Sequence, residues 1–208
     1  MTTLPIPTSW LLARLEHDTR DCHAAAEADR FRVLDDPTPA GYRRYLAAMY
    51  QLEYSVEARL VYIPDLPIAF VADSMRTGAL GEDLLALGTS GGTMAIFARS
   101  IELPPLRDAH EALGWMYVMQ RNTLQHAQVY RALAPRLRGT LHLASRYLTA
   151  HASRVYERWH ELGRHLDRAA TAPEHATAIV DSARAAFDHQ RRWFATAHAA
   201  KPDELALA

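Results

Sequence analysis

A histidine on an apolar helix face is the feature of this sequence that can most directly do chemistry. His23 lies in the segment LEHDTRDCHAAAEADRF, residues 15–31. Leu15, Thr19 and His23 are four residues apart, so on a helix they form one stripe that faces a single apolar pocket. A neutral imidazole held on a rigid helix beside such a pocket has a ring nitrogen free to bind a metal. His23 is therefore the first candidate metal ligand.

The bulk composition excludes several classes of function. The 208 residues carry 23 Lys and Arg against 24 Asp and Glu, so no overall field draws the chain to nucleic acid or to an anionic membrane. No apolar run approaches the roughly 20 residues of a membrane span, and the amino-terminal MTTLPIPTSW lacks the basic and apolar regions of a signal peptide. The single cysteine, Cys22, excludes an internal disulfide. We expect a cytoplasmic protein that binds neither nucleic acid nor a membrane.

The elements that must position His23 are almost all helical. Apolar periodicity predicts helices at about 10–30, 39–60, 71–87, 94–100, 106–133, 140–166 and 173–199. Two of these helices have a clear stripe expected to face the core, which comprises Tyr42, Tyr45, Leu46, Met49, Leu52, Val56 and Leu60 in the second helix and Ala176, Ile179, Val180, Ala183, Phe187, Gln190 and Phe194 in the last. Ser9 and Thr38 are expected N-caps, and Pro135 is expected to end the fifth helix. No run of alternating polarity competes with these segments. We predict an all-α fold, a single-domain multihelical bundle of six to eight helices over residues 1–208, with frayed ends at 1–8 and 200–208.

Several segments taken together resemble the haem oxygenase family. Residues 15–31 resemble the family's haem-binding helix, and PTPAGYRRYLAAMYQLEYSVEARL resembles its second helix. RTGALGEDLLALG and PEHATAIVDSARAAFDHQRRWF are similar to its short third helix and its last helix. The segment ALGWMYVMQRNTLQHAQVYRAL corresponds in position to the family's distal helix. Its first residues are similar to the motif ALGxxYVxxxxTL of the bacterial, phytochrome-associated type. The order and spacing of these segments imply a haem oxygenase-like fold.

This resemblance also implies a haem site and an activity. His23 would be the proximal iron ligand, with haem held between the first helix and residues 113–133. Haem, as both substrate and cofactor, would be oxidised with O2 and electrons to biliverdin, carbon monoxide and ferrous iron. The electron donor would be a ferredoxin or a flavoprotein reductase, and the protein a monomer or homodimer. The expected haem contacts are Thr19, Arg20, Glu27, Tyr117, Leu124, Gln125, His126 and Arg164, with Tyr117 near a propionate and Asn122 and Thr123 holding distal water.

The expected distal helix departs from the family where it crosses the haem. The family has glycines there, which let the backbone approach the ligand on the iron, whereas this chain has Gln125, His126 and Ala127. These side chains either hold the helix further from the haem or enter the space above the iron. If His126 reached the iron as a sixth ligand, the haem would be bis-histidine and suited to electron transfer or storage. If His126 turned aside, haem would still bind, in a shifted pose.

A second departure is Glu16, where the family usually has a Lys or Arg that pairs with a haem propionate. A carboxylate at this position repels a propionate instead of neutralising it. Arg20, one turn further on, is expected to replace that pairing, with help from Arg158 or Arg164. Because a surface ion pair contributes about 0.2 to 1 kcal/mol, one unfavourable charge weakens binding without abolishing it.

Two other functions fit the same set of helices. One is a catalytically silent protein that binds haem or another tetrapyrrole for storage, transport or sensing, which the substituted distal helix favours. The other is a di-iron oxidase, whose metals sit among Glu-x-x-His ligands on bundle helices. Glu157 and His160 have that spacing, and Glu53 and Glu57 are candidate carboxylate ligands, but the chain has no second Glu-x-x-His. Oxidation of haem is the main prediction, and both alternatives stay open.

Overall fold

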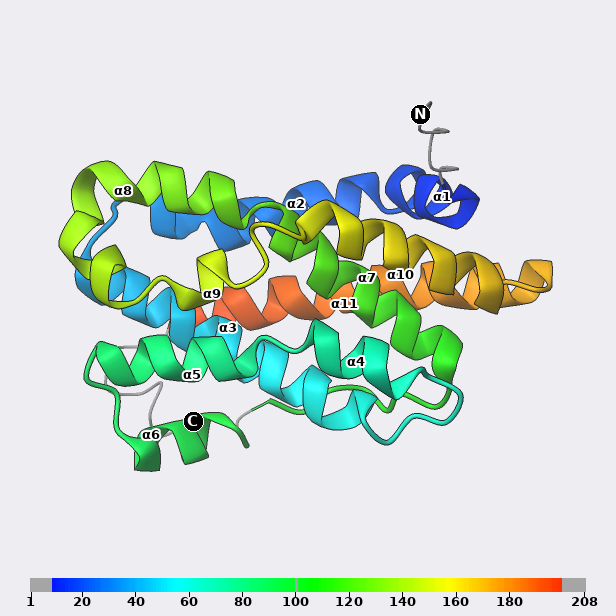
Figure 1. Cartoon of the computed structure of the whole chain (residues 1–208), viewed down its shortest axis with the longest axis horizontal. Coiled ribbons are helices and arrows are strands. Elements are labelled where there is room, and N and C mark those ends of the chain that lie inside the picture. Colours follow the sequence, from blue (N-terminus) through cyan, green and yellow to red (C-terminus); the bar gives the residue numbers. More distant parts are fainter. Residues whose placement is uncertain (1–8, 100, 200–208) are drawn as a thin grey trace, which may run out of the picture.

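The chain folds into a bundle of packed α-helices (Figure 1). The computed structural model describes residues 9–99 and 101–199, and within these ranges it contains no strand. The helices are α1 (Trp10–Asp18), α2 (Arg20–Phe31), α3 (Pro39–Leu60), α4 (Ile68–Ser74), α5 (Thr77–Ala86), α6 (Gly91–Phe97), α7 (Ala109–Leu124), α8 (His126–Leu143), α9 (Arg146–Thr149), α10 (Val155–Ala169) and α11 (Pro173–Ala199), and a 3-10 turn, η1 (Arg32–Leu34), follows α2. The all-α prediction is confirmed, although the helices are divided more finely than the expected six to eight. The ends expected to be frayed lie outside the described residues.

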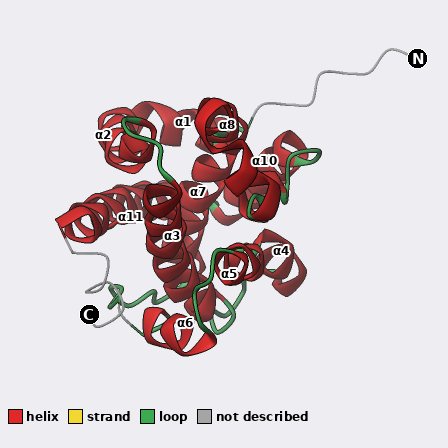
Figure 2. Ribbon diagram, turned by 90° about the vertical axis from the view of Figure 1, so that its left-hand side faces the viewer, coloured by secondary structure: helices red, strands yellow, loops and turns green. Residues whose placement is uncertain are grey.

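Helices α3, α7 and α11 form the centre of the bundle (Figure 2). Helices α1, α2 and α8 lie on one side of this centre, and α4, α5 and α6 lie on the other. Helix α7 packs closely on α11 because residue 114 is a glycine: a Cβ there would lie 2.6 Å from the carbonyl oxygen of Ile179. The apolar stripe expected on α11 is buried in full, at Ala176, Ile179, Val180, Ala183, Phe187, Gln190 and Phe194.

The two expected N-caps are confirmed. The Ser9 side chain accepts a hydrogen bond from the Leu12 amide at the start of α1, and the Thr38 side chain accepts one from the Gly41 amide at the start of α3. Each bond satisfies an amide that has no partner inside its helix. The stripe expected on α3 is buried, at Tyr42, Tyr45, Leu46, Met49, Leu52, Val56 and Leu60. None of the described helices is long and apolar enough to span a membrane.

Two segments expected to be continuous helices are each divided in two. The first is interrupted at Thr19 (φ −110°, ψ 9°), whose hydroxyl donates to the carbonyl of Leu15 at 2.7 Å. The segment expected at 71–87 is divided between α4 and α5, because the amides of Arg76 and Thr77 donate to the half-buried carboxylate of Glu57 instead of continuing a helical ladder. Side chains thus set both helix ends, which apolar periodicity does not reveal.

The fifth helix is interrupted twice. An interruption that was not expected lies at Gln125 (φ −95°, ψ −5°), between α7 and α8. Helix α8 passes through Pro135 with a local kink at Leu137 (φ −117°, ψ 25°). The break expected at Pro135 therefore lies two residues later, where two helical parts of α8 meet across this kink.

The prediction of one continuous helix over residues 140–166 is wrong. Helix α8 ends at Leu143, and the short α9 and the longer α10 follow as separate elements. Helix α9 is held by Asp83 of α5, whose carboxylate accepts from the amides of Arg146 at 3.0 Å and Tyr147 at 2.9 Å. This long-range cap redirects the chain and fixes Tyr147 in the core.

Candidate functional site

His23 lies on α2 where that helix faces α7 and α11. Its side chain is 16% exposed, and its ring centroid lies 5.6 Å from that of Phe187 on α11. Burial, followed by the positive charge of Arg121, lowers the pKa of His23 from its usual value of 6.5. The imidazole is therefore mainly neutral at pH 7, which is the form that binds a metal.

Two charged side chains, one acidic and one basic, lie close to the Nε2 atom of His23. It lies 3.2 Å from Oε2 of Glu27, one helical turn further along α2, and 3.4 Å from Nε of Arg121 on α7. Arg121 also donates from Nη1 to Oε1 of Glu16 at 2.9 Å. Since a guanidinium can only donate, the tautomer that accepts from Arg121 carries its proton on Nδ1. In that tautomer the lone pair that would bind a metal is directed at Arg121.

Gln125 links the two sides of this site at the break between α7 and α8. Its carboxamide nitrogen donates to Oε2 of Glu27, and its carboxamide oxygen accepts from Nη2 of Arg30. Arg30 is 1% exposed and its guanidinium lies 5.0 Å from the ring centroid of Phe31. We call the six side chains that meet here the His23 cluster: Glu16, His23, Glu27, Arg30, Arg121 and Gln125.

Thr19 and Tyr117 lie beneath His23 in the core. Thr19 is buried, and its hydroxyl donates to the carbonyl of Leu15. Tyr117 is 1% exposed; its ring centroid is 6.2 Å from that of Phe187, edge to face, and 5.5 Å from that of Trp159. Both residues therefore form the floor under His23, and Tyr117 does not lie at an exposed edge where a propionate would emerge.

The residues expected to hold distal water are bonded to other protein groups. Nδ2 of Asn122 donates to Oε1 of Gln190 at 2.8 Å, and Oγ1 of Thr123 donates to the carbonyl of Met119 at 3.1 Å. Both side chains are buried, whereas the neighbouring Leu124 is half-buried. Asn122 thus ties α7 to α11, whereas the bond of Thr123 lies within α7.

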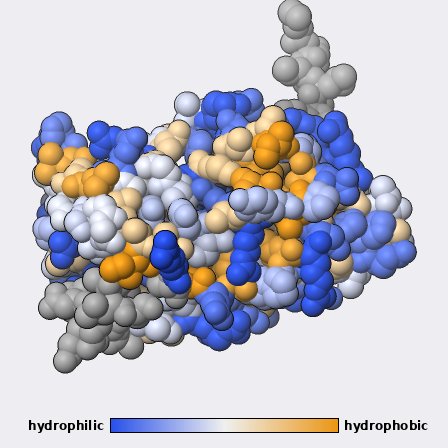
Figure 3. Space-filling view, turned by 90° about the horizontal axis from the view of Figure 1, so that it is seen from below, coloured by the Kyte–Doolittle hydropathy of each residue, from blue (hydrophilic) through white to orange (hydrophobic). Residues whose placement is uncertain are grey.

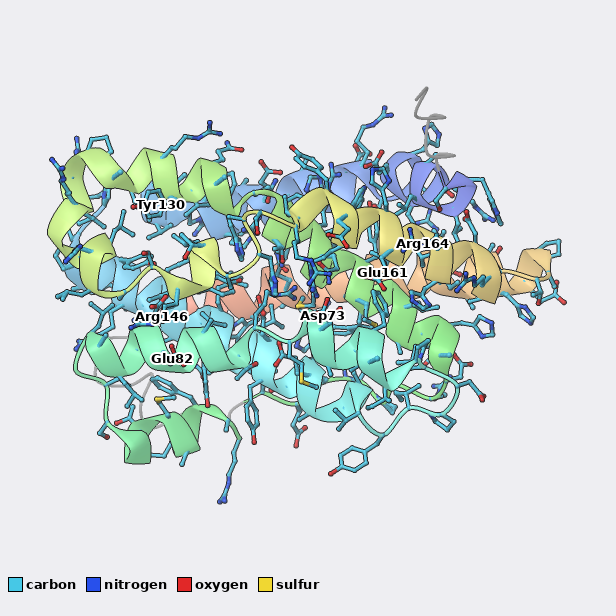
Figure 4. All side chains as sticks on the ribbon, in the orientation of Figure 1. Asp73, Glu82, Tyr130, Arg146, Glu161 and Arg164 are labelled. Carbon is cyan, nitrogen blue, oxygen red and sulfur yellow. The ribbon has the colours of Figure 1, made fainter. Side chains whose placement is uncertain are left out.

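The arginines expected to pair with a propionate are divided between the surface and the core. Arg20 on α2 and Arg164 on α10 are exposed, and Figure 4 labels Arg164 on its helix. Arg158 is 1% exposed and donates to the carboxylate and the carbonyl of Asp73 on α4. Arg158, which was expected to help bind a propionate, is instead occupied by Asp73.

His126, the first residue of α8, turns away from His23 to pack on Tyr147. Its side chain is 4% exposed, and the two ring centroids are 4.4 Å apart. Burial first, and then the charges of Arg76, Arg30 and His151, keep the pKa of His126 well below 6.5. Its Nε2 atom is buried without a hydrogen-bond partner among the described residues. His126 is thus a buried neutral base.

A carboxylate lies on the far side of Tyr147. The Tyr147 hydroxyl donates to Oε1 of Glu53 at 2.5 Å, and Nε of Arg76 donates to Oε2 of the same carboxylate at 2.8 Å. Glu57, one turn along α3, accepts from the amide of Arg76 at 2.6 Å. We call His126, Tyr147, Glu53, Arg76 and Glu57 the His126 cluster. Every oxygen of the Glu53 carboxylate has a protein donor.

The ligands expected for a di-iron centre do not come together. Glu157 is exposed on α10 and pairs with Arg154 at 3.1 Å, whereas Glu53 is buried and bonded to Arg76 and Tyr147. Across the part of the chain that the structure describes, no three His, Cys, Asp or Glu side chains are grouped to hold a metal ion.

Arg121 and Arg30 are site residues that the sequence reasoning missed. Tyr117, Arg121 and Gln125 are four residues apart, as Leu15, Thr19 and His23 are, and Arg30 is seven residues after His23. Helical neighbours at these intervals share a face. The same stripe argument, applied to α7 and to the end of α2, would have placed both arginines in the site.

Comparisons with known proteins identify relatives of this chain. A model of the heme oxygenase family matches residues 9–196. The fold is similar to that of a heme oxygenase from Neisseria meningitidis, solved with NO and with CO bound, with a TM-score of 0.71, 18% sequence identity and 92% of each chain covered. At this identity the likeness shows the fold alone. No curated protein matches the sequence.

Proposed function

Because the chain belongs to the haem oxygenase family, we propose that it binds haem through His23 and oxidises it, with O2 and electrons, to biliverdin, carbon monoxide and ferrous iron. The observation that best supports this proposal is the neutral, half-buried ring of His23 between α2 and α7. When bound, haem supplies the iron at which O2 is activated and the carbon skeleton that is oxidised. The chain supplies the ligand, the orientation and the surrounding charges.

The residues around His23 fit an axial ligand. Nε2 would bind iron after Arg121 withdraws from it, and Nδ1 would keep the ring proton. Oε2 of Glu27, which lies 3.2 Å from Nε2, would likewise have to move away from that atom. Phe187 and the buried Leu15 provide an apolar floor that excludes water from this face.

Arg121 would give up its hydrogen bond to His23 and pair with a haem propionate when haem binds. In the structure it donates to His23 and to Glu16. His23 would use its Nε2 lone pair to hold the haem iron, and the Nε–H of Arg121 would then be free to donate to a haem propionate. The pairing of Glu16 with Arg121 also answers the charge problem expected at Glu16, because this carboxylate is compensated within the protein instead of facing the propionate.

The closed contacts at Gln125 support a second candidate function, the binding of haem without turnover. The Gln125 side chain bridges Glu27 and Arg30, so both bonds must open before a flat ligand enters between α2 and the α7–α8 break. A bis-histidine haem would further require His126 to leave Tyr147 and move out of the core. Such a bis-histidine haem would be held by the protein but would bind O2 poorly.

A titration of the purified protein with hemin, followed by reductant under air, separates these functions. We expect tight 1:1 binding, then loss of the haem absorbance with appearance of a biliverdin spectrum. A stable low-spin six-coordinate spectrum that survives reduction supports the silent candidate instead. Absence of hemin binding contradicts both candidates.

His17→Ala is the matched control for His23→Ala in this titration. His17 is an exposed histidine on the adjacent helix α1. We expect His17→Ala to bind and degrade haem as the unsubstituted protein does, and His23→Ala to lose the spectrum of the histidine-ligated haem. An unchanged spectrum in His23→Ala would show that His23 is not the ligand.

A further inference from the structure

Two charged residues flank His23 at equal intervals along the chain. Glu16 precedes it by seven residues, and Arg30 follows it by seven, which is two turns of α2, so Arg30 shares the helix face of His23. Glu16 is exposed and pairs with Arg121, whereas Arg30 is almost fully buried. We call the part of the site at Glu16 and Arg121 its outer end and the part at Arg30 its inner end.

The guanidinium at the inner end is a buried charge with too few partners. Nη2 of Arg30 donates to the carboxamide oxygen of Gln125, which is a neutral group. Nε and Nη1 of Arg30 are buried without a hydrogen-bond partner in the described part of the chain. Because a guanidinium stays charged and a buried charge without a counter-ion is strongly unfavourable, this arginine lacks the anion that would suit it.

Other buried arginines of the molecule do have such an anion. Arg76 pairs with Glu53, and Arg158 pairs with Asp73. Most charged residues lie at the surface instead: Figure 3 shows the face of α4, α5 and α6 seen from below, where hydrophilic residues lie among apolar ones. Water hydrates such surface groups, so they need no partner within the protein. Arg30 has neither of these two means of compensation.

Two further polar side chains lie beside Arg30 in the core. Burial raises the pKa of Tyr45 on α3, and the charge of Arg30 opposes that rise, which places the phenol close to the guanidinium. The same charge, after burial and Arg76, contributes to the low pKa of His126 on α8. Nε2 of His126 has no hydrogen-bond partner among the described residues. The inner end therefore offers polar groups from three helices.

The acids nearest to the inner end are already engaged. Glu27 accepts from the carboxamide nitrogen of Gln125, and Glu53 accepts from Nε of Arg76. Neither carboxylate hydrogen-bonds to Arg30, whose acceptor in the described chain is Gln125. A carboxylate partner for Arg30 must therefore come from a ligand.

Both ends of the site border the same gap between helices. Arg30 reaches from α2 to Gln125 at the α7–α8 break, and Arg121 reaches from α7 to His23 and Glu16 on the other side. Arg30 lies roughly 10.5 Å along the helix axis from His23, since each residue of a helix rises about 1.5 Å. A flat ring held at His23 thus has a guanidinium toward each end.

We propose that the His23 site takes an iron porphyrin with carboxylates on opposite edges, one edge for Arg121 and the other for Arg30. This inference rests on the proposed function and names the class of haem that the site prefers. Hemin carries both propionates on one edge and apolar vinyl and methyl groups on the opposite edge, so it leaves one end of the site without its partner. A carboxylate at the inner end accepts from Nε and Nη1 of Arg30, the paired geometry that suits a guanidinium.

Two porphyrins that differ at one edge test this proposal. Iron coproporphyrin III has propionates where hemin has its two vinyl groups, and the remaining substituents are the same. We expect the unsubstituted protein to bind iron coproporphyrin III at least about tenfold more tightly than hemin, because buried charge-assisted hydrogen bonds are gained. Absorbance titrations measure both affinities. Metal-free coproporphyrin III and protoporphyrin IX, followed by fluorescence, should show the same order of affinity.

Substitution of Arg30 shows whether this preference comes from its guanidinium. Arg30→Met removes the charge and keeps a long side chain, so we expect the preference for iron coproporphyrin III to disappear. Arg43→Met, which removes an exposed arginine from α3, is the control and should keep it. Circular dichroism checks that each variant is folded. Equal weakening of both porphyrins in Arg30→Met would mean that Arg30 only supports Gln125, which overturns the proposal.

The same titrations separate failure of this inference from failure of the proposed function. Equal or weaker binding of iron coproporphyrin III than of hemin by the unsubstituted protein overturns the preferred class, even where hemin is oxidised. A preference that depends on Arg30, with neither iron porphyrin oxidised under reductant and air, contradicts the proposed oxidation alone. The metal-free porphyrins test the preference without ligation by His23. Absence of binding of all four porphyrins overturns both proposals.

Discussion

The His23 cluster and the His126 cluster lie on either side of the α7–α8 break, and they differ most in exposure. In the His23 cluster the side chains of His23, Glu27 and Arg121 are 16%, 27% and 26% exposed. In the His126 cluster the side chains of Glu53 and Arg76 are 0% and 2% exposed. Both clusters combine a histidine whose pKa is lowered with carboxylates and arginine.

This difference separates a site that can exchange partners from one that cannot. Water can replace a partner that leaves Arg121 or Glu27, so a ligand can displace these contacts at modest cost. No water reaches Glu53, so loss of either of its donors leaves a buried charge uncompensated. The two histidines therefore have different tasks, since His23 can receive a ligand and His126 fills and stabilises the core beside it.

Removal of the buried carboxylate should have the largest effect. We expect Glu53→Ala to lower the free energy of unfolding by about 3 to 5 kcal/mol, because Arg76 and the Tyr147 hydroxyl lose their shared acceptor. Glu16→Ala, which removes the exposed partner of Arg121, should lower it by less than about 1 kcal/mol. Urea denaturation followed by circular dichroism measures both. Equal losses would show that the two clusters do not differ in the way that their exposure indicates.

Substitution of the two histidines should separate ligand binding from stability. We expect His23→Ala to weaken hemin binding by more than about 100-fold, because metal sites already lose 10- to 100-fold when only a supporting residue is changed. His126→Gln should leave the haem spectrum unchanged and reduce stability, because the ring packed on Tyr147 is lost. Hemin titration and thermal unfolding measure the two effects. A change of axial ligation in His126→Gln would show that His126 binds the iron. The two histidines would then not differ as ligand and core residue.

Shortening Gln125 should make the His23 cluster easier to open. Gln125→Ala removes the bridge between Glu27 and Arg30 that must break before haem enters. Each hydrogen bond to a charged group contributes on the order of 1.5 to 3 kcal/mol, part of which returns to water, so we expect hemin affinity to rise about tenfold. Gln128→Ala, at an exposed position on α8, is the control. Weaker hemin binding in Gln125→Ala would mean that the amide contacts haem instead of closing the site.

The sequence predicted what depends on local periodicity. The buried stripes of α3 and α11 and the caps at Ser9 and Thr38 follow from residue spacing alone, and the structure confirms each of them. The stripe of Leu15, Thr19 and His23 likewise faces the interior, although the helix is interrupted at Thr19. Periodicity is a property of one helix, so these features need no knowledge of neighbouring elements.

The sequence did not predict what depends on contacts between distant segments. The breaks before α5 and α9 are held by the carboxylates of Glu57 and Asp83, which come from other helices. The interruption at Gln125, whose side chain bonds to residues on α2, was not expected. Whether an individual arginine is exposed or buried, as for Arg158, is equally set by partners that lie far away in the chain. Such pairings require the packed structure.

Acidification should produce the smallest effect, and the contribution of His126 to it can be measured separately. Burial and the charges of Arg76, Arg30 and His151 keep His126 neutral in the folded protein, whereas in the unfolded chain it titrates near pH 6.5. The unfolded state therefore binds more protons below pH 6.5, so stability falls as pH decreases. From pH 6.5 to 5.5 one such histidine lowers the free energy of unfolding by about 1 kcal/mol, and His126→Gln should reduce the pH dependence by that amount. His151, with a pKa of about 4, adds a similar slope that this variant keeps. Urea denaturation at both pH values measures the difference. An unchanged slope in His126→Gln would mean that His126 gains its proton without leaving the core.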